Sequence, residues 1–305
     1  MCFSKLMNLK LIDAHTHVQF AAYQNDTEAV IGRALDAGIW LVNVGTQLDT
    51  SKEAIALAEK YPQGVYATVG LHPIHTDKSF HDQEELGQGG AEFTSRGEIF
   101  DYGAYKELAA HKKVVAIGEC GLDYYADFAR ERSERLQKRA SAEAESEGGL
   151  FELRKEKQKL AFIQHIELAF ELKKPLMIHC RQAFPDLIAL LRANRSKLPA
   201  VPGIIHFFSG TEREANHLLD MGLFFTFGGV ITFARDYDEI IKAVPISRML
   251  LETDAPYVTP SPYRGQRNEP AYVVEIAKKL AEIKEVSLEE IQHHTVENAR
   301  AIFGI

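Results

Sequence analysis

The sequence predicts a (β/α)8 barrel, a TIM barrel formed as a single domain over residues 1–305. Eight short apolar runs recur along the chain, and segments with helical periodicity separate them. Strands that are apolar on both faces and alternate with helices are typical of a parallel sheet with helical crossovers. Eight such units favour a closed barrel over an open sheet, and a chain of this length is ordinary for that fold.

Each predicted strand is a run dominated by Val, Ile, Leu or Phe. The predicted strands are residues 9–14, 39–44, 65–69, 114–117, 176–178, 204–206, 223–227 and 249–251. Between them, apolar residues recur at the spacing of a helix face. The predicted helices are residues 27–37, 51–61, 101–110, 150–172, 184–195, 212–221 and 236–244. Two more helices, 271–283 and 288–303, follow the last strand and can cap it.

Two stretches depart from this repeat, and we interpret both as insertions. Residues 79–98 form a long polar connection, rich in glycine and acidic residues, after the third strand. Residues 127–147 alternate in charge sign, which is typical of a solvated, salt-bridged helix or a flap. Because this second stretch begins close to a candidate ligand, a lid or an arm that grips a substrate strand is the functional alternative.

The composition is that of an ordinary globular protein, with 46% hydrophobic and 26% charged residues. No apolar stretch is long enough to span a membrane, and the first residues lack the apolar core of a signal peptide. We therefore expect a cytoplasmic protein without a membrane partner, and a monomer, although the sequence does not determine the oligomeric state. The net charge of −8 excludes a generally basic surface, so a polyanionic substrate would need a local patch and bound metal.

Histidine and acidic residues gather at one end of the predicted strands. His15 and His17 follow the first strand at i and i+2, where alternate side chains of a strand share a face. The same end of the fourth, fifth, sixth and eighth strands carries Glu119, His179, His206 and Asp254. A barrel brings these strand ends together at the face where active sites form, so the sequence predicts a metal centre there.

The strand order assigns three of these residues to one divalent ion. The first and last strands are neighbours in a closed barrel, so His15, His17 and Asp254 can share an ion. Asp254 can also accept a proton from an attacking hydroxide, which makes it a candidate catalytic base as well as a ligand.

A second divalent ion is predicted between the fifth and sixth strands, held by His179 and His206. Glu119 has two carboxylate oxygens and can bridge both ions, so we include it among the catalytic residues. Two ions about 3.5–4 Å apart make hydroxide available near neutral pH. Nitrogen and oxygen ligands without thiolate suit Zn²⁺, Mn²⁺ or Mg²⁺.

His72, in the segment Gly70-Leu-His-Pro73 after the third strand, is a third candidate catalytic residue. Its imidazole can bind the substrate or protonate a leaving group. The alternative is that this segment only ends the strand.

Six residues near the same strand ends are candidate substrate contacts: Asp123, Tyr124, Arg181, Ser209, Arg264 and Arg267. Asp123 and Tyr124 follow Glu119 closely enough to line the same mouth. Arginine suits bidentate recognition of phosphate, and Ser209 offers a hydroxyl. Arg264 and Arg267 lie in a polar loop after the last strand and can reach a phosphodiester, unless that loop is tied down by its own hydrogen bonds.

Taken together, these motifs resemble the signatures of the TatD family of metal-dependent hydrolases. The resemblance covers the chain from near residue 12 to its end and rests on these segments: His15-x-His17, Gly70–Pro73, Ile117–Tyr124, His179-Cys-Arg181, His206–Gly210, Glu252–Tyr257 and Arg267–Pro270. It implies a TIM barrel of the amidohydrolase-like superfamily, with divalent metals held by all six ligands named above. It also implies deoxyribonuclease activity.

The resemblance shapes the expected function. Family members are associated with 3′–5′ exonuclease action on DNA, and some with removal of D-amino acids from tRNA. We expect a divalent-metal-dependent deoxyribonuclease with DNA as its partner. The alternative is an ester hydrolase, such as a D-aminoacyl-tRNA deacylase, that uses the same two-metal site on tRNA. A barrel without catalytic activity is disfavoured by the intact ligand set.

Overall fold

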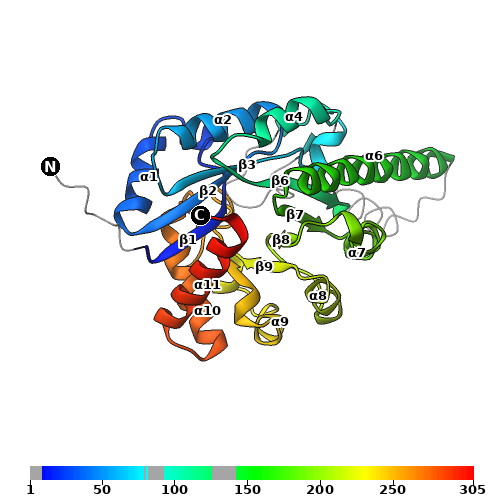
Figure 1. The fold of residues 1–305 in the computed structure, drawn as a ribbon. Coiled ribbons are helices and arrows are strands. Elements are labelled where there is room, and N and C mark those ends of the chain that lie inside the picture. The colour runs from blue at the N-terminus through cyan, green and yellow to red at the C-terminus, as the bar shows by residue number, and fades with distance from the viewer. Residues whose placement is uncertain (1–8, 79, 82–92, 126–141) are drawn as a thin grey trace.

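The computed structural model describes residues 9–78, 80–81, 93–125 and 142–305. At its centre is a closed barrel of parallel strands surrounded by helices (Figure 1). The barrel strands are β1 (Leu11–Thr16), β2 (Ile39–Val44), β3 (Val65–Val69), β6 (Val114–Asp123), β7 (Leu176–Arg181), β8 (Gly203–Ile205), β9 (Phe224–Phe227) and β10 (Met249–Leu251). The predicted (β/α)8 fold is therefore confirmed.

Neighbouring barrel strands follow one another along the chain, and β1 closes the ring. Asp13 of β1 pairs with Leu41 of β2 on one side and with Leu251 of β10 on the other. Two strands are longer than predicted, because β6 continues through Asp123 and β7 through Arg181. The predicted strands ended at the last apolar residue. The observed strands continue because polar residues of the site lie within them.

The helices lie outside the barrel, and the short 3-10 turns lie in the connections. The α-helices are α1 (Thr27–Asp36), α2 (Leu48–Glu59), α4 (Tyr102–Ala109), α6 (Ala142–Leu172), α7 (Phe184–Ala193), α8 (Glu212–Leu219), α9 (Asp238–Ala243), α10 (Val273–Lys284) and α11 (Leu288–Phe303). The 3-10 turns are η1 (Ala21–Tyr23), η2 (Pro73–Thr76), η3 (Arg195–Lys197), η4 (Gly229–Thr232), η5 (Ile246–Arg248) and η6 (Pro270–Tyr272).

Local sequence explains where several helices begin. The Thr211 hydroxyl accepts a hydrogen bond from Glu214 N while the Glu214 side chain accepts one from Thr211 N, which is a capping box. Asp101 and Ser287 cap α4 and α11 through a side-chain oxygen that accepts a backbone N–H of the first turn.

The two predicted insertions are described only in part. In the first, β4 (Phe80–His81) pairs antiparallel with β5 (Phe93–Thr94), and residues 82–92 lie outside the described residues. The end of the second belongs to α6, which begins at Ala142 rather than at the predicted residue 150. The rest of that insertion lies outside the described residues. Figure 1 shows α6 projecting beyond the barrel.

The interior of the barrel is closed at the N-terminal end of its strands. Ile12, Met177 and Leu250 from three strands form one buried cluster with Ile302 and Phe303 of α11. The opposite end, where the strands terminate, is left for polar residues. Trp40 is buried in the same cluster.

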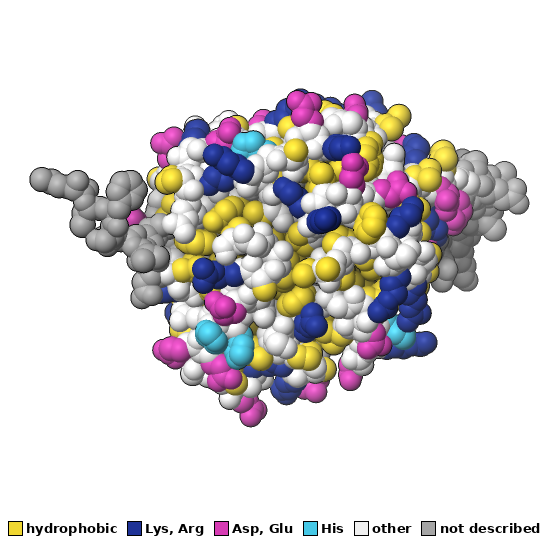
Figure 2. Space-filling view, in the orientation of Figure 1, with side chains coloured by type: hydrophobic (Ala, Val, Ile, Leu, Met, Phe, Trp, Pro, Cys, Tyr) yellow, Lys and Arg dark blue, Asp and Glu magenta, His cyan; other side chains and the backbone are white. Residues whose placement is uncertain are grey.

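A groove of about 710 Å³ lies at this N-terminal end, between the starts of β6 and β7 and the end of α11. Its lining includes Val114, Phe170, Leu198 and Phe303. Figure 2 shows hydrophobic side chains, with Lys and Arg among them, on the face where α11 lies. Within the described parts of the chain, no helix combines the length and apolar character that a membrane span requires.

Candidate metal centre

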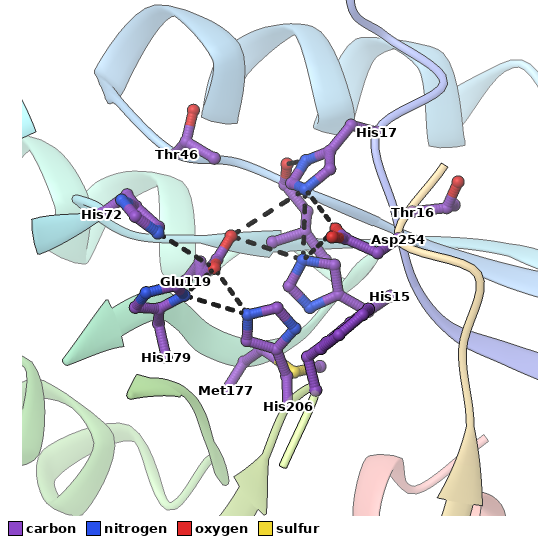
Figure 3. A network of polar contacts seen from close by, with 12 residues as sticks. His15, Thr16, His17, Thr46, His72, Glu119, Met177, His179, His206 and Asp254 are labelled. Atoms are coloured by element: carbon purple, nitrogen blue, oxygen red, sulfur yellow. Dashed lines mark hydrogen bonds and ion pairs between the residues drawn. The ribbon is translucent and has the colours of Figure 1, made fainter. Parts of the chain in front are cut away.

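The side chains of all six predicted ligands converge at the C-terminal end of the barrel (Figure 3). They come from β1, β6 and β7 and from the connections that follow β1, β8 and β10: His15, His17, Glu119, His179, His206 and Asp254. Glu119 lies at the centre of the group, and its two carboxylate oxygens face different sets of neighbours.

We call the group around Glu119 Oε2 the first half-site. His15 Nε2 lies 3.3 Å and His17 Nε2 3.9 Å from this oxygen. Asp254 Oδ1 lies 3.4 Å from His17 Nε2 and 3.7 Å from His15 Nε2. The two histidine nitrogens are 3.1 Å apart. Two nitrogens and two carboxylate oxygens therefore surround one point.

We call the group around Glu119 Oε1 the second half-site. His206 Nε2 lies 2.8 Å, His179 Nδ1 3.0 Å and His72 Nε2 3.2 Å from this oxygen. The ring nitrogens of His179 and His206 are 3.1 Å apart. Glu119 thus joins two groups of donors, one on each oxygen.

The donor chemistry of both half-sites fits divalent cations. His17 Nδ1 donates to Val44 O at 2.8 Å, which leaves the lone pair of Nε2 facing Glu119. His179 Nε2 donates to Asp123 Oδ2 at 2.8 Å, which leaves the lone pair of Nδ1 facing Glu119. Among the residues that the structure describes, no donor satisfies all of these closely gathered lone pairs, and a cation would do so. Nitrogen and oxygen donors without thiolate suit Zn²⁺ or Mn²⁺.

Electrostatics keep the site carboxylates ionised. Burial would raise the pKa of Glu119, but the charges of His72, His206 and His15 outweigh it and hold that pKa well below its ordinary value. Burial would also raise the pKa of Asp254, but its hydrogen bond with His17 outweighs this effect and the pKa is lowered. Both carboxylates are therefore ionised at neutral pH and can serve as ligands.

Two glycines allow β6 to pass close to β7 on either side of Glu119. Gly118 has φ +142°, and a Cβ there would lie 2.2 Å from Met177 O. Gly121 has φ +138°, and a Cβ there would lie 2.0 Å from His179 O. A side chain at either position would push β6 away from β7 and with it the bridging carboxylate.

Asp123, predicted to contact substrate, lies behind His179 instead. Its Oδ2 accepts the hydrogen bond from His179 Nε2, and its Oδ1 accepts one from Tyr125 N at 2.9 Å. With both oxygens engaged and the residue buried, this geometry favours orienting the His179 ring over contacting substrate. Glu252 lies 3.6 Å from His206 Nδ1 in a similar relation.

His72 lies within the second half-site with a defined proton position. Its Nδ1 accepts a hydrogen bond from Ile74 N at 3.2 Å. A neutral ring must then carry its proton on Nε2, the atom that faces Glu119 Oε1. Burial lowers the pKa of His72, which favours this neutral form.

Two other predicted substrate contacts are engaged within the protein. The Tyr124 hydroxyl donates to Asp186 Oδ2 at 3.0 Å, and the ring is buried. Arg267 donates to both oxygens of Asp26, at 2.8 and 2.6 Å, and its guanidinium lies over the Tyr23 ring. Arg267 therefore matches the alternative of a loop held by its own hydrogen bonds.

The other three predicted contacts lie on the rim of the site. Ser209 is exposed in the connection after β8. The Arg181 guanidinium lies 3.4 Å from the centre of the Tyr125 ring. Arg264 donates to Thr259 O at 2.9 Å, and its guanidinium lies 4.0 Å from the centre of the Phe233 ring.

Three supporting residues were missed by the sequence analysis. Asp13 Oδ2 accepts from the Thr253 hydroxyl at 2.6 Å, which ties β1 to the residue before Asp254. Asp13 could have been found from the sequence, because it is an acidic residue inside an apolar strand. Gln158 of α6 contacts the end of β6 and His165 contacts the loop after β3, and nothing in a polar helix distinguishes these two residues.

His165 predicts a pH dependence of stability. Its ring is buried, with Nδ1 donating to Ala161 O and Nε2 accepting from Leu71 N, and burial lowers its pKa to about 4. Because the unfolded chain binds this proton near pH 6.5, the neutral ring's contribution is present at pH 7 and is lost as the pH falls toward 4. Between pH 7 and 5.5 we expect a loss of roughly 1 kcal/mol.

Urea unfolding of the metal-free protein at both pH values measures this loss. The variant His165→Gln keeps an acceptor for Leu71 N but does not titrate, so its stability should fall by roughly 1 kcal/mol less than that of the wild type. Equal losses of stability in the wild type and in His165→Gln would show that His165 is not the group responsible for the pH dependence.

Residues 12–304 match the sequence profile of the family described as TatD related DNase. A metal-dependent hydrolase of Bacillus subtilis (strain 168), YabD, is 36% identical over 298 residues, which cover 97% of this chain and 99% of that protein. TatD of Klebsiella pneumoniae (strain 342), named a 3′-5′ ssDNA/RNA exonuclease, is 30% identical over 303 residues, 97% of this chain and 98% of that protein.

Solved structures show the same similarity. The TatD homolog YjjV from Escherichia coli K12 superposes with a TM-score of 0.75 and 26% identity, over 97% of this chain and 98% of that one. A TatD family hydrolase from Entamoeba histolytica superposes with a TM-score of 0.71 and 25% identity, over the same shares.

Proposed function

Because this chain belongs to the family of TatD-related DNases and is a metal-dependent hydrolase, we propose that it is a nuclease that removes nucleotides from the 3′ end of DNA. The observation that carries this proposal is the convergence of two donor groups on the two oxygens of Glu119. A paired site of this kind suits displacement at a phosphodiester.

In this proposal each half-site holds one divalent ion, Zn²⁺, Mn²⁺ or Mg²⁺. His15, His17 and Asp254 would hold the first, His179 and His206 the second, and Glu119 would serve both. Such ions lower the pKa of water and polarise phosphoryl oxygens.

Asp254 is proposed as the proton acceptor for the attacking water. Its side chain is 17% exposed, whereas that of Glu119 is 5% exposed, so Asp254 is the carboxylate of the pair that substrate can approach. His72 is proposed to donate a hydrogen bond from its Nε2–H to the leaving oxygen, because the contact at Nδ1 holds that proton on the site-facing nitrogen.

The rim supports a nucleic acid substrate over a small ester. Arg181 and Arg264 follow barrel strands at the end where the site lies, and each guanidinium stacks on an aromatic ring. Arginine binds phosphate, and an exposed ring stacks with any base. Paired in this way, they form a local patch for a polyanion on a chain of net charge −8.

Phe233→Ala tests this rim. Phe233 is 43% exposed, and base stacking contributes about 1–3 kcal/mol, so KM for a single-stranded oligodeoxynucleotide should rise about tenfold with kcat within twofold. Bis(p-nitrophenyl) phosphate has no base, and its hydrolysis should not change. Phe170→Ala, at a ring 51% exposed in the groove at the other end of the barrel, is the matched control. An unchanged KM in Phe233→Ala would show that Phe233 does not contact the substrate.

The proposed function is tested with substrates offered side by side. Protein stripped of metal and reloaded with Mn²⁺ or Zn²⁺ is given 3′- and 5′-labelled single-stranded DNA, duplex DNA and D-aminoacyl-tRNA. We expect metal-dependent loss of nucleotides from the 3′ end of the single strand. Deacylation of the tRNA without DNA cleavage would favour the ester hydrolase, and no metal-dependent cleavage of DNA would overturn the proposal.

A further inference from the structure

Helix α6 supports one half of the metal centre and not the other. We propose that Gln158 and His165 of this helix are positioning residues of the second half-site: Gln158 sets its affinity for the ion, and His165 sets the position of His72. This inference rests on the proposed two-ion function, and it concerns side chains that touch neither a metal ligand nor substrate directly.

Gln158 holds the backbone of Asp123 by both of its polar groups. Its Oε1 accepts from Asp123 N at 2.8 Å, and its Nε2 donates to Asp123 O at 2.9 Å. Asp123 in turn orients His179 through the 2.8 Å contact between Oδ2 and Nε2. A buried side-chain amide therefore fixes the residue that aims a ligand of the second ion.

His165 holds the loop that carries His72. Its Nε2 accepts from Leu71 N at 2.9 Å, and Leu71 is the residue before His72. The ring is buried and lies 4.1 Å from the Phe100 ring, centre to centre, so its place is defined by packing as well. Gln158 and His165 are two helical turns apart and lie on one face of α6.

The first half-site has other supports. His17 Nδ1 donates to Val44 O, Asp254 N donates to His15 O, and Asp13 holds Thr253. In the described part of the chain, no α6 side chain forms a hydrogen bond or ion pair with His15, His17 or Asp254. A substitution on this face of α6 should therefore affect the second half-site and leave the first unchanged.

A purely structural role would give a different result. Buried polar groups need partners wherever they lie, and losing one lowers the stability of the fold. Such a loss would weaken both ions together or neither. A positioning role weakens one ion and spares the other, so the two roles are separated by ion binding rather than by stability.

Calorimetric titration of the metal-free protein with Mn²⁺ makes this separation. The wild type should bind two ions. Gln158→Met keeps the length of the side chain but makes neither hydrogen bond, so the second ion should bind 10–100-fold more weakly and the first within twofold of wild type. Loss of a neighbouring carboxylate or amide partner of a ligand has effects of this size. Electron paramagnetic resonance should show the coupled Mn²⁺ pair in the wild type and an isolated ion in the variant.

Gln164→Met is the matched control, because Gln164 lies on the same helix and makes no side-chain hydrogen bond within the described residues. It should bind both ions as the wild type does. His165→Leu removes the acceptor for Leu71 N, so it should displace His72 and lower kcat while both ions bind as in the wild type; His165→Gln, which keeps that acceptor, should restore kcat.

Wild-type binding of both ions by Gln158→Met, or equal weakening of both, would overturn the inference. A wild-type protein that binds a single ion would instead refute the two-ion function on which it rests.

Discussion

Replacing Glu119 by glutamine is expected to remove both bound ions and to lower kcat/KM for DNA by at least about 10³-fold. Glu119 supplies one oxygen to each half-site, so its neutral amide weakens both at once. Metal ions supply several kcal/mol of transition-state stabilisation, and about 4 kcal/mol corresponds to a thousandfold change in rate. Metal analysis of the purified variant and steady-state kinetics with single-stranded DNA measure the two effects.

The substitution has a matched control in Glu98→Gln. Glu98 is a partly buried carboxylate outside the metal centre that accepts a hydrogen bond from the Tyr105 hydroxyl at 2.6 Å. Its variant should keep both ions and wild-type kcat. A Glu119→Gln protein that retains both ions and a tenth or more of the wild-type activity would show that this carboxylate does not bridge.

Asp254→Asn should lower kcat by about 10²–10⁴-fold at saturating Mn²⁺, because it removes the proposed proton acceptor. Asparagine is the right replacement, since Asp254 has φ +54° and asparagine tolerates that left-handed conformation where alanine does not. The amide keeps one ligand oxygen, so the loss in ion affinity should be smaller than the loss in kcat. Calorimetry with Mn²⁺ and single-turnover kinetics separate the two.

Retention of wild-type kcat by Asp254→Asn at saturating metal would assign the proton to another group. Asp186→Asn serves as control, since Asp186 is bonded to Tyr124 away from the half-sites and its loss should leave kcat unchanged.

The parts of the site that the sequence predicts are those set by strand geometry. The ligands His15 and Glu119 are far apart in the chain, yet their place at strand ends was enough to bring them together, because a barrel has one such end. The fold prediction and the family resemblance rest on the same regularity, and both are confirmed.

Side-chain direction and distant partners were not predictable from residue type. Arg267 suits phosphate by its chemistry, but Asp26, 241 positions earlier, holds its guanidinium. Asp123 lies beside the mouth in sequence, but its carboxylate points to the back of His179. Neither contact can be predicted from the spacing of nearby residues in the sequence, because each partner lies on another element that the barrel fold brings close.

The same reason hides the role of α6. Gln158 and His165 contact residues 35 and 94 positions away, and a polar face on a helix reads as a solvated one. The end of β6 was hidden differently, because Glu119 and Asp123 broke the apolar run while the strand continued through them.

The most direct test of a carboxylate-bridged ion pair is anomalous diffraction from crystals of the Mn²⁺-loaded protein. We expect two peaks about 3.5–4 Å apart, one beside each oxygen of Glu119 and both absent from Glu119→Gln crystals. A single peak, or a pair away from Glu119, would contradict it.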